Sequence, residues 1–349
     1  MSIRLTILGS GSRGNCAYLE TDGVRLLIDA GFSGKRIRER LASIGRTPET
    51  LNGILITHEH SDHTMGLKII AAKLGIPLYA NRLTLDAVSS QTKTPFNSKI
   101  FHTGQSFEVG DVEVETFSIP HDAQDPVGFL IRSNHGNVGF LTDLGHATRL
   151  VLDRVRPAKA LVLETNYDLQ LLQEDTRRPW SIKQRITSRH GHLSNSAAGE
   201  AARELVSDEL GHIFMAHLSK DCNDPAIAEK TVQQEIDKTG ARHIRIHRTN
   251  QDAPCPTLIL GDSPNPATMK SEIPAVTTNV SPKPESQPAL PKVPNKHTPS
   301  IVRSQKEPPN PADEQKHRSF FSGLQDALGD LNEDTKSDSR KQDISDDDT

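Results

Sequence analysis

The stretch "ILITHEHSDH", residues 54 to 63, joins an apolar segment directly to a cluster of ionisable side chains. Its first four residues are typical of a buried strand, and five of its last six positions carry His, Asp or Glu. Burying these charges without partners would cost several kcal/mol each. Bound divalent cations would offset that cost, and three histidines within six residues are difficult to explain by core packing. The stretch therefore predicts a metal site.

The spacing of this loop predicts two metal positions. His58 and His60 are two residues apart, so in an extended segment they point to the same side, whereas Asp62 and His63 come one turn later. One loop cannot complete two coordination spheres, so further ligands must come from other segments. Four candidates follow apolar, strand-like segments, where site residues of layered α/β folds usually lie: Asp29, His121, Asp143 and His217.

Strand and helix signals alternate through residues 1–261. The segments expected to form strands are 3–9, 16–20, 24–30, 53–57, 111–119, 127–133, 137–143, 159–164, 212–219, 243–247 and 257–260. Helices are expected between Ser33, a plausible N-cap, and Gly45, and from about Thr64 to Leu74, with further helices at 181–188, 194–207 and 225–240. Mixed strand groups interrupted by helices predict an α/β sandwich in which helices cover two sheets.

The composition changes near Gly261. Twelve of the 22 prolines fall between Pro264 and Pro311, and residues 262–349 carry 11 Lys and Arg against 15 Asp and Glu. Residues 1–261 balance at 30 against 30. We therefore expect a catalytic domain at 1–261 and a disordered tail at 262–349 that is first Pro-rich and then acidic. A short helical motif at 319–332 could bind a protein partner through Phe320–Leu331, or could be an apolar stretch without a partner.

The cysteines and the hydropathy of the chain indicate the cellular compartment of the protein. Cys16, Cys222 and Cys255 are far apart and form no CxxC pair, which favours reduced thiols in a cytoplasmic protein. No window approaches ~18 uninterrupted apolar residues, so neither secretion nor a membrane span is expected. The neutral charge balance of residues 1–261 does not exclude nucleic acid, because a local basic face is sufficient to contact phosphates.

These motifs resemble a known family. "HEHSDH" has the form HxHxDH, and with a distant His, an Asp and a final His it resembles the metallo-β-lactamase superfamily of metallohydrolases. The segments "GSGSRGN", "LLIDAGFSGK", "PHDAQDPVGF", "ETNYD" and "GHLSN" resemble more narrowly the YycJ/WalJ group of bacterial exonuclease-like members. The resemblance covers residues 1–261 and none of the tail. It implies a four-layer αββα sandwich.

The resemblance also implies a ligand set. Metal one would be bound by His58, His60 and His121, metal two by Asp62, His63 and His217, and Asp143 would bridge them. Asp29 would orient the histidine loop through hydrogen bonds, the alternative being a turn-capping role before Gly31. The ions would be Zn²⁺ or Mn²⁺, since histidine-rich ligation suits the former and the carboxylates leave the latter open.

A site with two metal ions of this kind indicates a displacement reaction at phosphorus. Cations ~3.5–4 Å apart lower the pKa of a shared water and stabilise the attacking and leaving oxygens of a displacement. Asp62 would orient the attacking water. His192, with His190 as a substitute, would protonate the leaving oxygen, unless its loop only caps a helix. By resemblance, a bridging Asp143 favours phosphoesters over β-lactams.

A basic segment follows the site motifs. Residues 177–192 hold five Lys or Arg, no acidic residue and Trp180, which suits either a phosphate backbone or a solvated helix face. The candidate substrate contacts are Ser12, Asn15, Asn166, Arg178 and Lys183.

The sequence therefore predicts a cytoplasmic, dinuclear metal-dependent phosphodiesterase acting on nucleic acid. The YycJ/WalJ resemblance implies a 5′-to-3′ exonuclease on double-stranded DNA with a role in repair. An RNA endonuclease, a phosphodiesterase for small cyclic nucleotides and a non-catalytic scaffold are the alternatives. A complete ligand set would be unnecessary in a scaffold.

Overall fold

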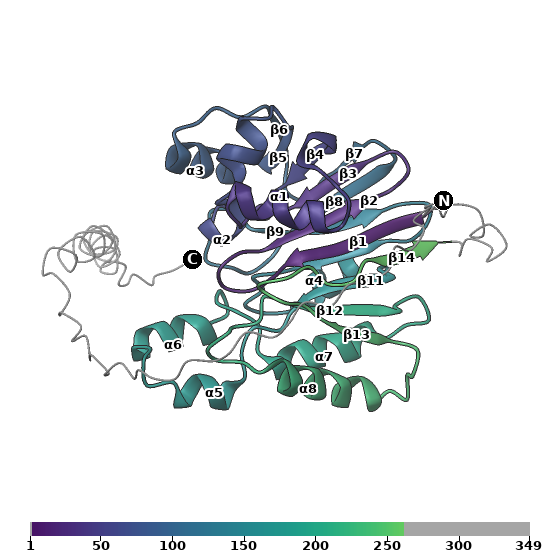
Figure 1. Ribbon diagram of the computed structural model, residues 1–349. Helices are drawn as coiled ribbons and strands as arrows, with labels where there is room; N and C mark the ends of the chain where they lie inside the picture. The colour runs from purple at the N-terminus through teal and green to yellow at the C-terminus, as the bar shows by residue number, and fades with distance from the viewer. Residues whose placement is uncertain (1, 262–349) are drawn as a thin grey trace, which may run out of the picture. The chain divides into compact units, whose positions relative to one another are not determined.

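Two seven-stranded sheets pack face to face in residues 2–261, the part of the chain that this computed structural model describes (Figure 1). The expected tail at 262–349, with its motif at 319–332, lies outside the described residues. The first sheet has the order β14-β1-β2-β3-β4-β5-β6 and the second the order β13-β12-β11-β10-β9-β8-β7.

The strands of the first sheet are β1 (Ser2–Gly9), β2 (Cys16–Glu20), β3 (Arg25–Ile28), β4 (Gly53–Leu55), β5 (Leu78–Asn81), β6 (Ser98–Phe101) and β14 (Leu258–Gly261). Those of the second are β7 (Ser106–Val109), β8 (Val112–Ser118), β9 (Val127–Arg132), β10 (Val138–Leu141), β11 (Ala160–Glu164), β12 (His212–Ala216) and β13 (Arg245–Arg248). The helices are α1 (Gly34–Ser43), α2 (Ser61–Thr64), α3 (Arg82–Thr92), α4 (Arg149–Val155), α5 (Leu169–Glu174), α6 (Trp180–Thr187), α7 (Asn195–Leu205) and α8 (Pro225–Asp237), with short turns η1 (Pro48–Thr50) and η2 (Lys68–Ala72).

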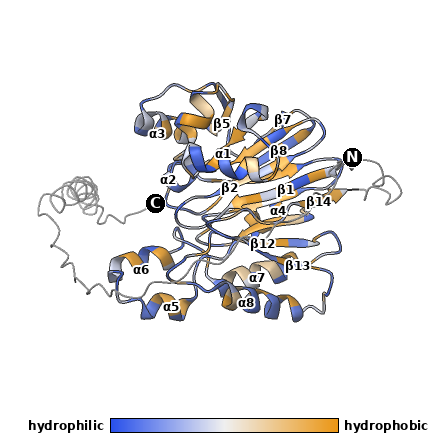
Figure 2. Cartoon of the chain, in the orientation of Figure 1, coloured by the Kyte–Doolittle hydropathy of each residue, from blue (hydrophilic) through white to orange (hydrophobic). Residues whose placement is uncertain are grey.

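The layers follow from strands that are apolar on both faces. In β1, Ile7 belongs to the core between the sheets, and the next residue, Leu8, belongs to the core under α1. In the second sheet Val162 faces inward, whereas Leu163 packs against the helices that cover the outer face. Figure 2 shows the apolar colour concentrated along the strands. The expected four-layer αββα sandwich is therefore confirmed.

The segment after the histidine loop differs from expectation. A continuous helix was expected from about Thr64 to Leu74, but α2 begins at Ser61 and gives way to the wider π turn η2. The N–H of His63 already donates to the carbonyl of His60, so Asp62 and His63 lie on the first helical turn. The strands and helices of residues 78–109, together with α4 and α5, were not predicted. No helix in residues 2–261 combines the length and the apolar composition that a membrane span requires.

Candidate metal centre

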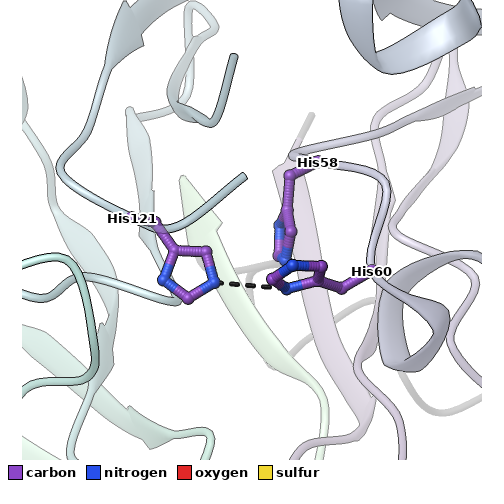
Figure 3. Close-up of side chains that lie close together, drawn as sticks. All are labelled: His58, His60 and His121. Carbon is purple, nitrogen blue, oxygen red and sulfur yellow. Dashed lines mark hydrogen bonds between the residues drawn. The ribbon is translucent and has the colours of Figure 1, made fainter. Parts of the chain in front are cut away.

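Three imidazoles form the first group of side chains, which we call cluster one: His58, His60 and His121. Nδ1 of His121 donates to the carbonyl of Gly191 at 3.1 Å, so its Nε2 faces the other two rings. That Nε2 lies 3.3 Å from Nδ1 of His60 (Figure 3). Nδ1 of His58 lies 3.0 Å from the Thr57 hydroxyl, and its buried Nε2 has no hydrogen-bond partner.

A second group, cluster two, mixes imidazoles and carboxylates: Asp62, His63, Asp143 and His217. Nε2 of His63 lies 2.9 Å from Oδ2 of Asp143, and Nε2 of His217 lies 3.2 Å from Oδ2 of Asp62. Oδ1 of Asp143 is also 3.6 Å from Nε2 of His121, in cluster one. Asp143 therefore lies between the clusters.

The separations between these atoms fit divalent cations. At metal–nitrogen distances of 2.0–2.1 Å, two ligands of a tetrahedral site are about 3.3 Å apart. The observed separations of 3.3 Å in cluster one and 3.2 and 2.9 Å in cluster two are close to that value. Nε2 of His58 and Oδ2 of Asp143 are buried without a well-formed hydrogen bond, which an ion would explain. The residues present thus fit one cation in each cluster.

The two clusters differ in charge. Burial and the neighbouring imidazoles, that of His63 first, hold the pKa of His58 well below its usual range, so this ring is neutral, as a ligand must be. Burial also disfavours the protonated form of His63, but Asp143, Asp29 and Asp62 outweigh it and hold its pKa well above its usual range. A metal ion entering cluster two must therefore displace protons.

Backbone strain coincides with the site. Among residues 2–261, only four residues other than glycine have a positive φ, and three of them are Asp29 at 60°, Asp143 at 56° and His217 at 55°. Each follows the end of a strand by one or two residues. Such conformations cost about 1–3 kcal/mol each and persist where the surrounding structure enforces them. Here the turn directs all three side chains toward one region.

The comparison with known proteins decides the family. The model of the beta-lactamase superfamily domain matches residues 24–213. This chain belongs to that superfamily. It is 37% identical over 259 residues to a protein of Bacillus anthracis named exodeoxyribonuclease YycJ, covering 73% of this chain and 98% of that one. It is 38% identical over 240 residues to exodeoxyribonuclease WalJ of Streptococcus pneumoniae, covering 68% and 89%. The resemblance to the YycJ/WalJ group is thus confirmed.

Solved structures share the fold of this chain. The metallo-β-lactamase fold protein YhfI of Bacillus subtilis superposes with a TM-score of 0.57 at 16% identity, covering 73% of this chain and 99% of that one. Zn²⁺-bound PqqB of Methylobacterium extorquens gives a TM-score of 0.54 at 17% identity, covering 72% and 99%. At these identities the likeness concerns the fold alone.

Asp29 supports the histidine loop of this superfamily member. Its Oδ1 accepts the N–H of Thr57 at 2.9 Å, and its Oδ2 lies 2.7 Å from Nδ1 of His63. With Nδ1 held in this way, Nε2 of His63 faces cluster two. Both contacts join Asp29 to the histidine loop.

Glu164 has a comparable position that the sequence analysis missed. It ends β11 and is fully buried, and its Oε1 lies 2.8 Å from Nδ1 of both His192 and His217. Its Oε2 accepts the backbone N–H groups of Leu144 and Leu193. Burial alone would raise the pKa of Glu164, but the two histidines lower it below its ordinary value. The available signal was a polar residue ending the apolar run "ALVL", the same signal that identified Asp29.

His192, the expected proton donor, lies beside the clusters. Its Nδ1 is 2.8 Å from Glu164 and 3.7 Å from Oδ1 of Asp143, and its side chain is 18% exposed. Burial disfavours its protonation, but Glu164 outweighs burial and raises the pKa of His192. Because Nδ1 is held by Glu164, Nε2 remains available to a substrate. His190, the substitute, is exposed.

Two of the expected substrate contacts lie inside the site instead. Asn15 is buried, and its Nδ2 lies 3.1 Å from Nε2 of His63 and 3.4 Å from Oδ2 of Asp62. The Nδ2 of Asn166, also buried, donates to the backbone carbonyl of His217 at 2.7 Å. Both amides therefore support residues of cluster two. Ser12 is exposed on the same loop as Asn15 and remains a candidate contact.

The structure does not direct the other two expected contacts to the site. Lys183 is buried, and its ammonium donates to the carbonyl of Gln173 at 2.7 Å, which corrects the expectation that it binds substrate. Arg178 pairs with Asp175 and with Asp221. Their charges are used to hold the segment that contains α5 and α6.

Proposed function

We propose that this metallo-β-lactamase-fold hydrolase is a dinuclear metal-dependent phosphodiesterase that digests double-stranded DNA from the 5′ end. The observation that carries the proposal is the position of Asp143 between two complete ligand clusters, with the Glu164–His192 pair beside it. The exodeoxyribonuclease names of YycJ and WalJ support DNA as the substrate.

Two divalent cations, Zn²⁺ or Mn²⁺, would be held one in each cluster. When bound, such ions supply Lewis acidity toward phosphate and make water nucleophilic near neutral pH. Imidazole and carboxylate donors suit both metals.

Asp62 and His192 would orient the attacking water and protonate the leaving oxygen, respectively. The Asp62 side chain is 23% exposed, and its Oδ2 is fixed near His217, so its carboxylate can accept a hydrogen bond from an attacking water. His192 can donate its Nε2 proton to the leaving oxygen. The contact between its Nδ1 and Glu164 holds the imidazole ring in the orientation that this transfer requires. Glu164 itself accepts from two rings and two backbone N–H groups, so it positions these residues.

We propose DNA repair in the cytoplasm as the cellular role of such an activity. All three cysteines are buried and unpaired, which agrees with a reducing compartment.

The test uses metal-loaded protein with duplex DNA labelled at either end, single-stranded DNA, RNA and a cyclic nucleotide. We expect mononucleotides to be released from the 5′ end of duplex DNA. Asp62→Asn should abolish this release, and Asp86→Asn, a surface change on α3, should preserve it. Equal digestion by Asp62→Asn would overturn the mechanism, and cleavage of only RNA or only the cyclic nucleotide would overturn the substrate assignment.

A further inference from the structure

The only tryptophan of the chain is exposed. Trp180 begins α6, and 68% of its surface is accessible in the part of the chain that the structure describes. Ile182, on the same helix, is 37% exposed. A large aromatic side chain in this position leaves much apolar surface in water and can contact a partner.

The surroundings of Trp180 are basic. Residues 176–192 contain five Arg or Lys and no Asp or Glu. Lys183 is buried, but the side chains of Arg177 and Arg185 are 65% and 55% exposed, and Arg189 is exposed as well. Arg177 pairs with Asp175 and Asp221, and Arg185 pairs with Asp122, which fixes both guanidinium groups in place and offsets part of their charge. A basic rim around an aromatic side chain complements a nucleic acid strand.

Helix α6 is fixed to the metal-centre loops. Arg185 pairs with Asp122, the neighbour of His121. The carbonyl of Gly191 accepts a hydrogen bond from Nδ1 of His121. A Cβ at Gly145 would lie 2.4 Å from the carbonyl oxygen of Arg189, so the loop after Asp143 packs tightly against the end of this segment. Figure 1 shows α6 on the same side of the molecule as α2, which carries Asp62 and His63.

The length of α6 sets the reach of Trp180. A helix of eight residues is about 12 Å long, and one DNA strand advances about 3.4 Å per nucleotide. The helix therefore spans about three to four nucleotides, measured from its end near His192.

We infer that Trp180 is a stacking platform for an unpaired base of the DNA strand whose end lies in the metal centre, about four nucleotides from the cleaved bond. This inference rests on the proposed function and adds a preference to it. Bases within a duplex are already stacked on both faces, so Trp180 selects a frayed or overhanging end. Stacking of this kind does not depend on base identity.

Fluorescence tests the inference directly, because Trp180 is the only tryptophan of the chain, and emission excited at a wavelength that tyrosine does not absorb comes from it alone. Metal-loaded protein is titrated with DNA whose terminal linkages are phosphorothioates, so that it is bound but not digested. We expect an overhang of four or more nucleotides to quench the emission, and a blunt duplex to leave it unchanged. Binding of the same labelled DNAs is followed in parallel by fluorescence anisotropy.

Variants separate stacking from folding. Trp180→Ala should weaken binding of the overhang about 5- to 150-fold, the effect of one lost base stack, and leave binding of the blunt duplex unchanged. Trp180→Phe should restore most of the affinity. Leu150→Ala removes a comparably exposed apolar side chain, 67% accessible on α4, and should change nothing.

Each contrary outcome is distinct. DNA that binds by anisotropy without quenching Trp180, and binds Trp180→Ala equally well, overturns the stacking site and leaves the nuclease proposal intact. Protection of Trp180 from acrylamide in the free full-length protein would show that another part of the chain covers it, and would also overturn the inference. Failure of every DNA to bind would overturn the proposed function itself.

Discussion

The two ligand clusters are built on different electrostatics. Cluster one contains three imidazoles and no carboxylate of its own, and its rings are held by a threonine hydroxyl and a backbone carbonyl. Cluster two contains two aspartates, and the carboxylates of Asp29 and Glu164 hold its histidines. Cluster two can therefore keep protonated histidines as internal counter-ions, whereas cluster one has a buried nitrogen, Nε2 of His58, that has no hydrogen-bond partner and that a bound ion would satisfy.

This difference indicates how each cluster depends on metal. The carboxylates of cluster two attract a cation, but its histidines must first lose their protons, so we expect this cluster to bind metal more tightly as the pH rises. Cluster one offers neutral nitrogen ligands, which favour Zn²⁺ over Mn²⁺. Asp143 is the group common to both.

The largest effect should come from Asp143→Asn, which removes the charge that links the clusters. We expect both ions to be lost and DNA digestion to fall by about a thousandfold or more, the equivalent of several kcal/mol of transition-state stabilisation. Elemental analysis and an end-label assay measure the two effects. Retention of both ions would show that Asp143 does not hold them. Asp86→Asn, at an exposed ion pair on α3, provides the matched control.

Breaking cluster one alone should separate the two ions. His58→Gln removes the imidazole whose Nε2 has no partner, and no residue of cluster two hydrogen-bonds to that nitrogen. We expect the metal content to fall from two ions per chain to one, with loss of DNA digestion. Loss of both ions, or of neither, would contradict the division into two clusters.

The next change weakens cluster two through Glu164, a residue that contacts one of its ligands. Glu164→Gln leaves the side chain in place but removes the charge that holds His192 and His217, so metal affinity at cluster two should fall about 10- to 100-fold. Affinity at cluster one should be unchanged. A titration with Zn²⁺ followed by calorimetry resolves the two steps, and equal weakening of both would refute a selective role for Glu164.

A smaller effect is expected in the loop of residues 9–15, which contains Ser12 and Asn15. Asn15→Ala removes an amide that lies against Asp62 and His63, and should weaken the cluster-two step about tenfold, at the lower end for such supporting contacts. Ser12→Ala, on the same loop but exposed, should leave that step unchanged. If Ser12→Ala weakened metal binding as much as Asn15→Ala, the loop would act as a whole and not through Asn15.

The smallest effect concerns acid stability far from the metal centre. Burial raises the pKa of Glu115, but hydrogen bonds from Arg132 and Arg154 outweigh it and leave the pKa below its ordinary value near 4.5. A lowered native pKa means stability that is present above about pH 4.5 and is lost as the pH falls through the native pKa. Glu115→Gln should cost about 2 kcal/mol at neutral pH and flatten the acid limb of a denaturation series. An unchanged acid limb would exclude this ion pair as its cause.

The sequence revealed most where several ligands lie next to one another in the chain. His58, His60, Asp62 and His63 share one loop after a strand, so their composition alone indicated a metal site. Asp143 and His217 stood out as the first polar residues after apolar strands, and the family resemblance supplied their expected roles. The four-layer fold followed from the same alternation of strands and helices.

Side-chain direction explains what the sequence could not reveal. An asparagine in a loop can face substrate or neighbouring ligands, and only the fold shows that Asn15 and Asn166 face inward. Lys183 was a candidate substrate contact because it lies in a basic segment, yet it reaches a carbonyl across the α5–α6 segment. Glu164 was overlooked because a single glutamate after an apolar strand does not reveal that it binds two histidines.

The convergence of the two clusters on a pair of ions is tested most directly by anomalous diffraction from crystals of the Zn²⁺-loaded protein. We expect two peaks about 3.5–4 Å apart, the separation of a two-metal site, on either side of Asp143. The first should contact His58, His60 and His121, and the second Asp62, His63 and His217. No peak within either cluster, at full Zn²⁺ loading, would contradict the account.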